Sequence, residues 1–183
     1  LEGIGREVVI IQRSDHFLTG TDREVSEVLE KASIARGIET YCGTKIHRVD
    51  TTADGRKQVH FLHGEKEVSV TGDEILVAMG RRPATERLDL HAAHVGCTGH
   101  KVNVSATQQT SQSHIFAAGD VCSPLDVVHL AIQQGEIAAR TAPRLHTGSA
   151  EPLETMDHRL RLFGVFSHPQ VAAVGPSEDE LKE

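Results

Sequence analysis

The sequence lacks the features that mark several broad classes of protein. It has no block of Lys and Arg residues, and the formal net charge of its 183 residues is -7. Because nucleic-acid affinity depends on clustered cations that neutralise phosphates, this charge pattern argues against a nucleic-acid partner. No stretch approaches the roughly 18 consecutive apolar residues of a membrane-spanning helix. The first six residues also lack the basic and apolar regions of a signal peptide. We therefore expect neither a nucleic-acid nor a membrane partner.

Cysteine is scarce and scattered. Cys42, Cys97 and Cys122 are an odd number of cysteines, and none stands at a metal-ligand spacing such as C-x-x-C. This pattern predicts a reducing, cytoplasmic environment and no metal site.

The composition that is present predicts a folded core, since 38% of the residues are hydrophobic and 25% are charged. The chain begins with Leu1 rather than Met and reaches an apolar run almost at once. We expect it to be an internal piece of a longer protein.

The first third of the chain alternates strand and helix signals. The β-branched run 8–11 predicts a strand buried on both faces in a parallel sheet. Thr21-x-x-Glu24 has the form of a capping box and predicts a helix that ends at Gly37. Its expected apolar face comprises Val25, Val28, Leu29, Ala32 and Ala35.

An antiparallel meander is expected next. Segments 38–41 and 46–49 have strand-like composition, and 58–62 and 67–70 alternate in polarity, with turn signals at Asp54-Gly55 and His63-Gly64. The sequence predicts a small sheet inserted after the first strand and helix.

The rest of the chain returns to buried strands and helices. Segments 75–78 and 115–118 predict buried strands, and a helix is expected to start with Asp126 as its N-cap. Its expected apolar face comprises Val127, Val128, Leu130, Ala131, Ile132, Ile137 and Ala138. A linker-like composition over 146–155 is followed by strand-like segments 160–166 and 170–174 and by a helix start at Ser177. This order of elements predicts an α/β architecture that crosses domain borders.

Two of the predicted strands end in residues suited to ligand binding. Segment 75–78 leads into Gly80-Arg81-Arg82-Pro83, and segment 115–118 leads into Gly119-Asp120. In doubly wound sheets, ligands bind at the carboxyl ends of strands, where glycine allows close backbone approach. Either motif alone is equally typical of turn chemistry, because Asp commonly caps a turn after a buried strand.

Taken in order, these motifs resemble those of the flavoprotein disulfide reductases, the family of dihydrolipoamide dehydrogenase and mercuric reductase. The family pattern Asp-x-Ile/Leu-Leu-Val-Ala-x-Gly-Arg-x-Pro matches 73–83, and Thr-Ser-x-x-x-Ile-Phe/Tyr-Ala-x-Gly-Asp matches 110–120. A third pattern, Phe-Ser/Thr-x-Pro-x-Ile/Val-Ala-x-Val-Gly-x-Ser/Thr-Glu, matches 166–178. The similarity covers essentially the whole chain.

The resemblance implies a division into three parts. Residues 1–82 correspond to the rear of an NAD(P)-binding domain that carries the meander, 83–148 to the returning segment of an FAD-binding domain, and 149–183 to the start of an α+β dimerisation domain. Both dinucleotide domains are Rossmann-like, and the parent protein is expected to be a homodimer that uses FAD and NAD(P)H.

The same resemblance assigns flavin-binding roles. Asp120, after Gly119, matches the family aspartate that binds the ribityl chain of FAD, and a carboxylate is a suitable acceptor for a sugar hydroxyl. The amides at the start of the next helix would face the pyrimidine edge of the flavin, where the helix dipole stabilises negative charge; these residues are Asp126, Val127, Val128 and His129. The sequence gives His129 no orienting acid, so a solvent-facing or packing histidine is favoured over a proton-transfer role.

The expected pyridine-nucleotide residues are Gln12, Arg13, Ile46 and Gly80. Family members that use NADH usually carry an acid at the position of Gln12, where it accepts hydrogen bonds from ribose hydroxyls. The neutral Gln12 removes repulsion toward a 2′-phosphate, and Arg13 can pair with that phosphate. This favours NADPH, although Arg also follows the acid in many NADH-using relatives. Ile46 fits the adenine side of the cofactor or an ordinary core strand, and Gly80 the nicotinamide-ribose side.

Four motifs of the family do not occur in these residues: the two G-x-G-x-x-G loops, the C-x-x-x-x-C dithiol and the distal His-Glu pair. The expected parent enzyme transfers electrons between NAD(P)H and a disulfide, a dithiol such as dihydrolipoamide, or a thiol-bound metal ion. Without the dithiol, the chain alone is expected to be inactive, and Cys122 is expected to be an inert buried thiol. The alternative function is a non-catalytic dinucleotide-fold module that serves protein association.

Overall fold

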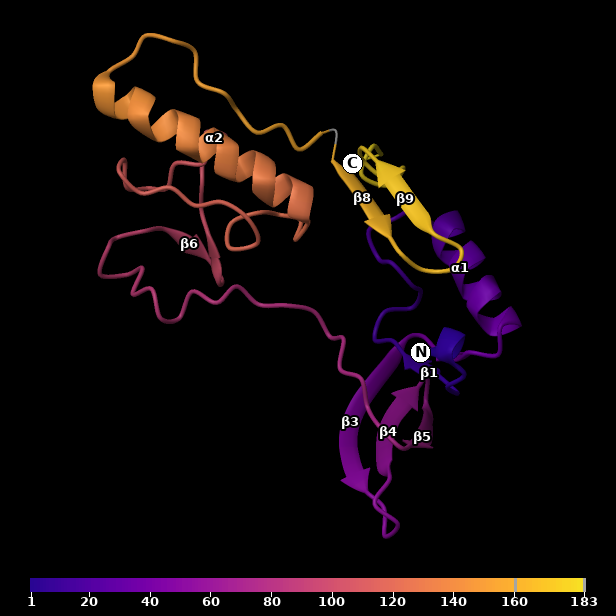
Figure 1. Cartoon of the computed structure of the whole chain (residues 1–183). Coiled ribbons are helices and arrows are strands. Elements are labelled where there is room, and N and C mark those ends of the chain that lie inside the picture. Colours follow the sequence, from indigo (N-terminus) through magenta and orange to yellow (C-terminus); the bar gives the residue numbers. More distant parts are fainter. Residues whose placement is uncertain (160, 183) are drawn as a thin grey trace. The chain divides into compact units, whose positions relative to one another are not determined.

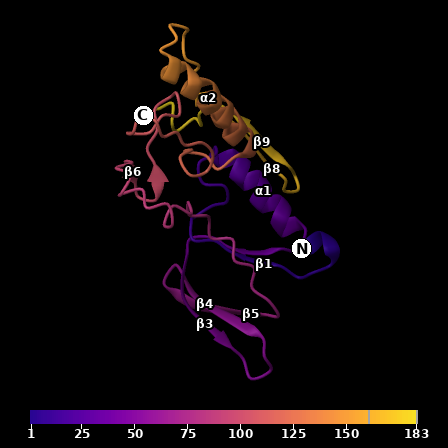
Figure 2. The ribbon, with the colours of Figure 1, turned by 60° about the vertical axis from the view of Figure 1, so that its left-hand side comes forward.

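The computed structural model describes residues 1–159 and 161–182, which form two compact units. One unit comprises Leu1–Ala78 together with Leu162–Glu183, and the other comprises Met79–Arg161. Figure 1 shows their elements along the chain, and Figure 2 shows the same ribbon turned by 60°. Neither helix labelled in these views has the length and apolar character needed to cross a bilayer, and the search covered only the described residues.

The first unit opens with a strand–helix–strand segment. A short 3-10 helix η1 (Glu2–Ile4) precedes β1 (Val9–Ile11), which pairs in parallel with β2 (Glu39–Tyr41) across the connecting helix α1 (Arg23–Ala35). The parallel strand predicted over 8–11 is confirmed. It is only half-buried, however, because β2 is its single neighbour among the described residues.

Helix α1 begins one residue later than the capping box predicts. Asp22 is the N-cap, and the Thr21 hydroxyl instead donates a hydrogen bond of 2.8 Å to the carbonyl of Leu18. Thr21 therefore closes the turn that leads into the helix. The predicted C-terminal glycine is confirmed, since Gly37 follows the helix with φ 87°.

The buried face of α1 also differs from the predicted one. Ser26, Leu29 and Ser33 are buried, whereas Val28 is exposed. The Ser26 and Ser33 hydroxyls donate to the carbonyls of Phe17 and Leu29, so burial leaves neither hydroxyl unpaired. Because both hydroxyls are hydrogen-bonded, the inward face of α1 can include these two serines.

The predicted meander is confirmed as a three-stranded antiparallel sheet, except that segment 38–41 supplies β2 of the parallel pair instead. It consists of β3 (Thr44–Thr51), β4 (Lys57–His63) and β5 (Lys66–Gly72). The register shifts between Ile46 and Arg48, and the central strand buries Phe61 completely against the Tyr41 ring. Gly55 and Gly64, at the two predicted turns, both have positive φ.

A hairpin completes the first unit. Strands β8 (Leu162–Val165) and β9 (Val171–Val174) pair antiparallel, and both views place them beside α1 (Figures 1 and 2). The Glu178 amide donates to the Asp22 carboxylate at 2.8 Å. The predicted strands are confirmed except at Leu160, which lies outside the described residues.

The helix predicted from Ser177 is wrong, because 178–182 form only turns.

The second unit is organised around one long helix. Two short strands, β6 (Cys97–Thr98) and β7 (Lys101–Val102), precede α2 (Val128–Thr147), which ends at Gly148 with φ 68°. Leu130, Ile137 and Met156 form its apolar core. The helix starts with Val127 as N-cap rather than Asp126, whose carboxylate pairs with Lys101 instead, and it buries Gln134 and Thr141 while Val128 and Ile132 stay exposed.

The two predicted strands that carry the glycine motifs are not strands here. Residues 75–78 have no ladder partner and are exposed, and Phe116 makes only an isolated bridge with Gln109. A buried parallel strand needs neighbours on both sides. Among the described residues, neither segment has such neighbours.

Candidate cofactor-binding sites

Asp120 lies at the centre of a charged cluster in the second unit. Its carboxylate pairs with the Arg81 guanidinium at 3.0 Å, and its side chain is about one-third exposed. A small pocket of about 160 Å³ is lined by Asp120 and by Arg81, Arg82, Pro83, Ala84, Val121 and Asp126. The tertiary fold thus brings the two strand-end motifs together.

This pocket suits part of a cofactor rather than a whole one. Sites that enclose a complete drug-sized ligand have volumes of about 300–1,000 Å³. A carboxylate accepts hydrogen bonds from sugar hydroxyls, and neighbouring guanidinium groups attract phosphate. The residues present therefore fit a sugar–phosphate segment such as that of FAD.

The backbone before Asp120 is fixed from inside the unit. Gly119 has φ 82°, a conformation that glycine adopts without strain. Its buried N–H donates a 2.8 Å hydrogen bond to the side-chain oxygen of Gln134 on α2, and its carbonyl accepts from the amides of Cys122 and Ser123. These bonds hold the turn that presents the Asp120 carboxylate.

A second ion pair lies where α2 begins. The Lys101 ammonium donates to the Asp126 carboxylate at 2.9 Å and also to the Ser123 carbonyl. The next residues, Val127, Val128 and His129, open the helix, and the last two are exposed. The predicted flavin residues thus lie in two nearby stretches, 119–120 and 126–129, and Asp120 and Asp126 line the same pocket.

Cys122 does not have the environment of a reactive thiol. Burial is the main factor acting on its pKa and raises it, and the nearby Lys101 charge opposes this only in part. The sulfur lies 3.5 Å from the Gly119 carbonyl oxygen. A thiol with a raised pKa is a poor nucleophile, in agreement with the inert role expected for it.

In the first unit, Gln12 and Arg13 follow directly from β1. The Gln12 amide donates to the Tyr41 carbonyl at 2.7 Å, and the Gln12 carbonyl accepts from both the amide and the hydroxyl of Thr44. Arg13 is exposed at the end of this ladder. The backbone at the end of β1, which was expected to face the ribose, is therefore fixed by hydrogen bonds, and the exposed Arg13 side chain follows it directly.

Ile46 and Gly80 occupy different units. Ile46 lies in β3, two residues beyond Thr44, and is partly exposed. Gly80 directly precedes Arg81 and has φ 94°. Gln12, Arg13 and Ile46 thus share one unit, whereas Gly80 belongs with the Asp120 cluster.

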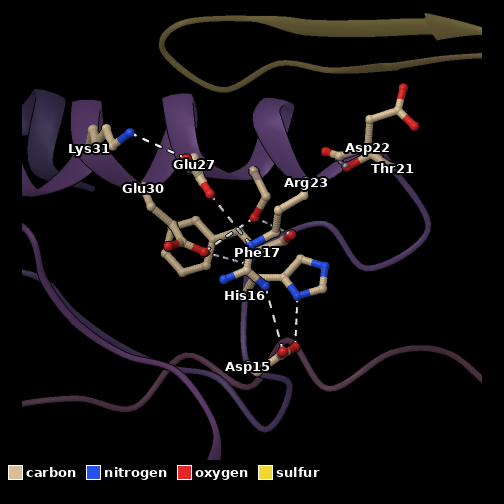
Figure 3. Close-up of polar contacts among 10 residues, drawn as sticks. Asp15, His16, Phe17, Thr21, Asp22, Arg23, Glu27, Glu30 and Lys31 are labelled. Carbon is tan, nitrogen blue, oxygen red and sulfur yellow. Dashed lines mark hydrogen bonds and ion pairs between the residues drawn. The ribbon is translucent and has the colours of Figure 1, made fainter. Parts of the chain in front are cut away.

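The loop after Arg13 carries its own polar network (Figure 3). Asp15 binds the His16 ring at 2.7 Å and the Arg23 guanidinium at 3.5 Å, and the His16 hydrogen bond is the main cause of a lowered Asp15 pKa. Behind it, the Phe17 amide donates to the Glu30 carboxylate at 2.8 Å. The loop is held by side chains as well as by its backbone.

The residues that support both sites carry no clear signal in the sequence. Arg81 was part of a recognised motif, but nothing in its spacing indicated a bond to Asp120. Gln134 and Glu30 are polar residues on predicted helices. Their position on the inward face of each helix is the one signal that could have identified them. Apolar spacing did not locate that face correctly.

Comparison with known proteins identifies the family. A family model described as pyridine nucleotide-disulphide oxidoreductase matches residues 1–135. The chain belongs to this family, which confirms the assignment made from the three motifs and the α/β fold class.

Individual relatives cover the chain almost completely. A mercuric reductase of Bacillus cereus is 33% identical over 186 residues, which cover 98% of this chain and 28% of that protein. A dihydrolipoyl dehydrogenase of Bacillus subtilis is 27% identical and covers 98% of this chain and 37% of its own length. The chain spans about one-third of the length of these curated relatives.

Solved structures agree with the fold. The crystal structure of LpdA from Mycobacterium tuberculosis superposes with a TM-score of 0.81 at 27% identity, covering 98% of this chain and 37% of that one. A flavoprotein disulfide reductase, RclA from Escherichia coli in complex with Cu(II), has a TM-score of 0.79 at 23% identity, covering 97% and 38%. At that identity, the second match supports the fold alone.

Proposed function

We propose that these residues are part of an FAD-dependent oxidoreductase that uses NAD(P)H. Its reducing equivalents pass to a disulfide or a thiol-bound metal ion, or arrive from a dithiol such as dihydrolipoamide. The observation that carries this proposal is the Arg81–Asp120 pair beside Asp126 at the start of α2. It supplies the carboxylate and the cations that a sugar–phosphate cofactor requires.

In the flavin half, Asp120 is assigned to the ribityl hydroxyls, on a turn that Gly119 makes possible. The segment Asp126-Val127-Val128-His129 is assigned to the pyrimidine edge, where the amides at the start of α2 favour negative charge. When bound, FAD supplies the hydride-accepting ring, and the protein positions and tunes it. His129 is assigned no proton-transfer role, since it is exposed on the first turn of the helix.

In the pyridine-nucleotide half, Gln12 and Arg13 are assigned to the adenosine ribose and its 2′-phosphate. Arg13 provides the cation for the phosphate, and Gln12 provides no opposing charge. Ile46 is assigned to the adenine side and Gly80 to the nicotinamide-ribose side. Together these assignments favour NADPH over NADH.

The proposed domain organisation follows the family. Residues 1–82 would belong to the NAD(P)-binding domain, 83–148 to the FAD-binding domain and 149–183 to the dimerisation domain of a cytoplasmic homodimer. The free thiols of Cys42, Cys97 and Cys122 are compatible with a reducing compartment.

The test is flavin retention in the full-length protein. Asp120→Ala removes a hydrogen-bond acceptor for the ribityl chain and leaves Arg81 unpaired, at a cost of about 1.5 to 3 kcal/mol in FAD binding. Flavin absorbance after gel filtration should fall relative to the wild type and to a control, Glu136→Ala, which removes an exposed carboxylate from α2. Unchanged occupancy would contradict the role of Asp120.

The 183-residue chain itself provides a second check. Without the dithiol it should not reduce dithionitrobenzoate with NADH or NADPH. Sustained turnover by the purified chain would contradict the proposal that catalysis requires a dithiol that these residues do not contain.

A further inference from the structure

Two side chains of α1 hold both polar backbone groups of Phe17. The Phe17 amide donates to the Glu30 carboxylate at 2.8 Å, and the Phe17 carbonyl accepts from the Ser26 hydroxyl at 2.6 Å. Ser26 also contacts the same Glu30 oxygen at 3.2 Å. We call Ser26, Glu30 and Phe17 the α1 clamp; Figure 3 shows Glu30 reaching from the helix toward the Phe17 backbone.

The α1 clamp lies on the inner side of the loop. Ser26 is fully buried and the Phe17 ring is buried beside it, while Glu30 is half-buried. The Ser26–Phe17 bond is buried and the Phe17–Glu30 bond is partly buried, so together they favour one backbone path. The clamp fixes residue 17 against α1.

The other end of the same loop is fixed independently. The Gly43 amide donates to the Ser14 carbonyl at 2.7 Å, and Thr44 binds the Gln12 carbonyl. Arg13, between Gln12 and Ser14, and Asp15, between Ser14 and the clamped Phe17, are both exposed. A loop held at both ends keeps its charged side chains in one arrangement. It therefore loses less conformational entropy on binding than a mobile loop would.

We propose that Glu30 and Ser26 are positioning residues for pyridine-nucleotide binding. They touch neither cofactor nor substrate; they fix the Phe17 end of the loop whose other end carries Arg13 at the proposed adenosine site. This inference rests on the proposed function, because the cofactor role of Gln12 and Arg13 is itself part of that proposal. The inference adds that nucleotide binding by Gln12 and Arg13 also depends on Glu30 and Ser26, which lie outside the binding site.

The test uses the full-length enzyme and four variants. Glu30→Ala and Ser26→Ala remove the clamp; Glu30→Gln keeps an oxygen that can accept the Phe17 N–H; Glu24→Ala removes an exposed carboxylate elsewhere on α1. Affinity for NADP+ and NAD+ is measured by calorimetry, the KM for the reduced nucleotide and kcat by steady-state kinetics, and the mobility of 13–20 by hydrogen–deuterium exchange.

Glu30→Ala and Ser26→Ala should each raise the Kd and the KM of the pyridine nucleotide about fivefold or more, with kcat within about twofold and FAD content unchanged. Exchange of the Phe17 amide should accelerate in the same variants. Glu30→Gln and Glu24→Ala should stay within about twofold of the wild type. If Glu30→Ala fails to fold, Ser26→Ala and Glu30→Gln carry the test.

Faster exchange of the loop with an unchanged Kd and KM would overturn the positioning role, because the loop would then lie outside the nucleotide site. Unchanged exchange would overturn the clamp itself. A wild-type enzyme that retains no FAD and does not oxidise NAD(P)H would instead refute the proposed function. The outcomes therefore separate the two claims.

Discussion

The two units fix their candidate cofactor loops in the same way but with different side chains. In the first, the Glu30 carboxylate of α1 accepts a 2.8 Å hydrogen bond from the Phe17 amide; in the second, the Gln134 side chain of α2 accepts a 2.8 Å bond from the Gly119 amide. In both, a helix reaches back to the loop that precedes it. A neutral amide occupies the buried position, and a carboxylate occupies the half-buried one.

This difference follows from the cost of burying charge. Gln134 is only 1% exposed, and an ionised group there would lose nearly all of its hydration. Glu30 keeps access to water and can remain charged, while its bonds to Phe17 and Ser26 gain from that charge. Burial therefore explains which anchor can carry charge.

The largest effect expected from this contrast is loss of the buried anchor. Gln134→Ala leaves the Gly119 N–H unpaired and creates a cavity, which should cost about 2 to 4 kcal/mol of unfolding free energy. Glu30→Ala should cost only about 1 kcal/mol, because water can replace the lost acceptor. Urea denaturation of the full-length protein, followed by circular dichroism, compares them. Equal losses would contradict the explanation from burial.

Exchanging the two anchor chemistries sharpens the same contrast. Gln134→Glu should destabilise the protein by about 1 to 3 kcal/mol at neutral pH, because the new carboxyl must either lose its hydration or take up a proton. The loss should shrink as the pH falls toward 4. Glu30→Gln, in contrast, should be close to neutral. Denaturation of both variants at several pH values tests this; a pH-independent loss for Gln134→Glu would argue against buried charge as the cause.

A smaller effect concerns cofactor choice in the first unit. Gln12→Glu places a carboxylate at the end of β1, where it would repel a 2′-phosphate and accept from ribose hydroxyls. The ratio of kcat/KM for NADH to that for NADPH should rise about tenfold, or roughly 1.4 kcal/mol of transition-state discrimination. A wild-type enzyme that strongly prefers NADH, or a ratio unmoved by the change, would mean that Gln12 does not face the ribose.

The smallest effect is expected on the surface of the second unit. Hydrogen bonds from Arg159 lower the pKa of Asp157 from 3.8 to about 2. Because the folded pKa is below the unfolded one, this stabilisation is complete above about pH 4 and is lost as the pH falls through about 2. Asp157→Asn should therefore be less stable than the wild type at neutral pH, and the difference should shrink as the pH falls through about 2. Denaturation curves across this range provide the measurement, and a constant difference would exclude the ion pair as its source.

The motifs and the local periodicities were predictable because they depend on neighbouring residues. Capping and turn signals located α1 and the meander turns at Gly55 and Gly64, and strand-like composition located β8 and β9. The strands predicted at 75–78 and 115–118 failed for the opposite reason. Their apolar runs are typical of buried parallel strands, but a strand also needs neighbouring strands, which a local run cannot supply.

The helix faces show the same division between local and tertiary information. Val28 and Val128 were expected to face inward by apolar spacing, yet both are exposed. Their places are taken by Ser26 and Gln134, whose polar groups bind distant loop atoms. Apolar periodicity cannot identify a buried polar anchor, because burial of such a group is favourable only when its partner is in place.

The sequence by itself determined the family, the α/β class and the identity of the motif residues, because three spaced motifs record local chemistry directly. Only the tertiary structure decided that Arg81 pairs with Asp120, that Asp126 pairs with Lys101, and that Glu30 and Gln134 hold the two loops. Each of these contacts joins residues at least 13 positions apart. Their geometry depends on how the chain packs, which no local pattern specifies.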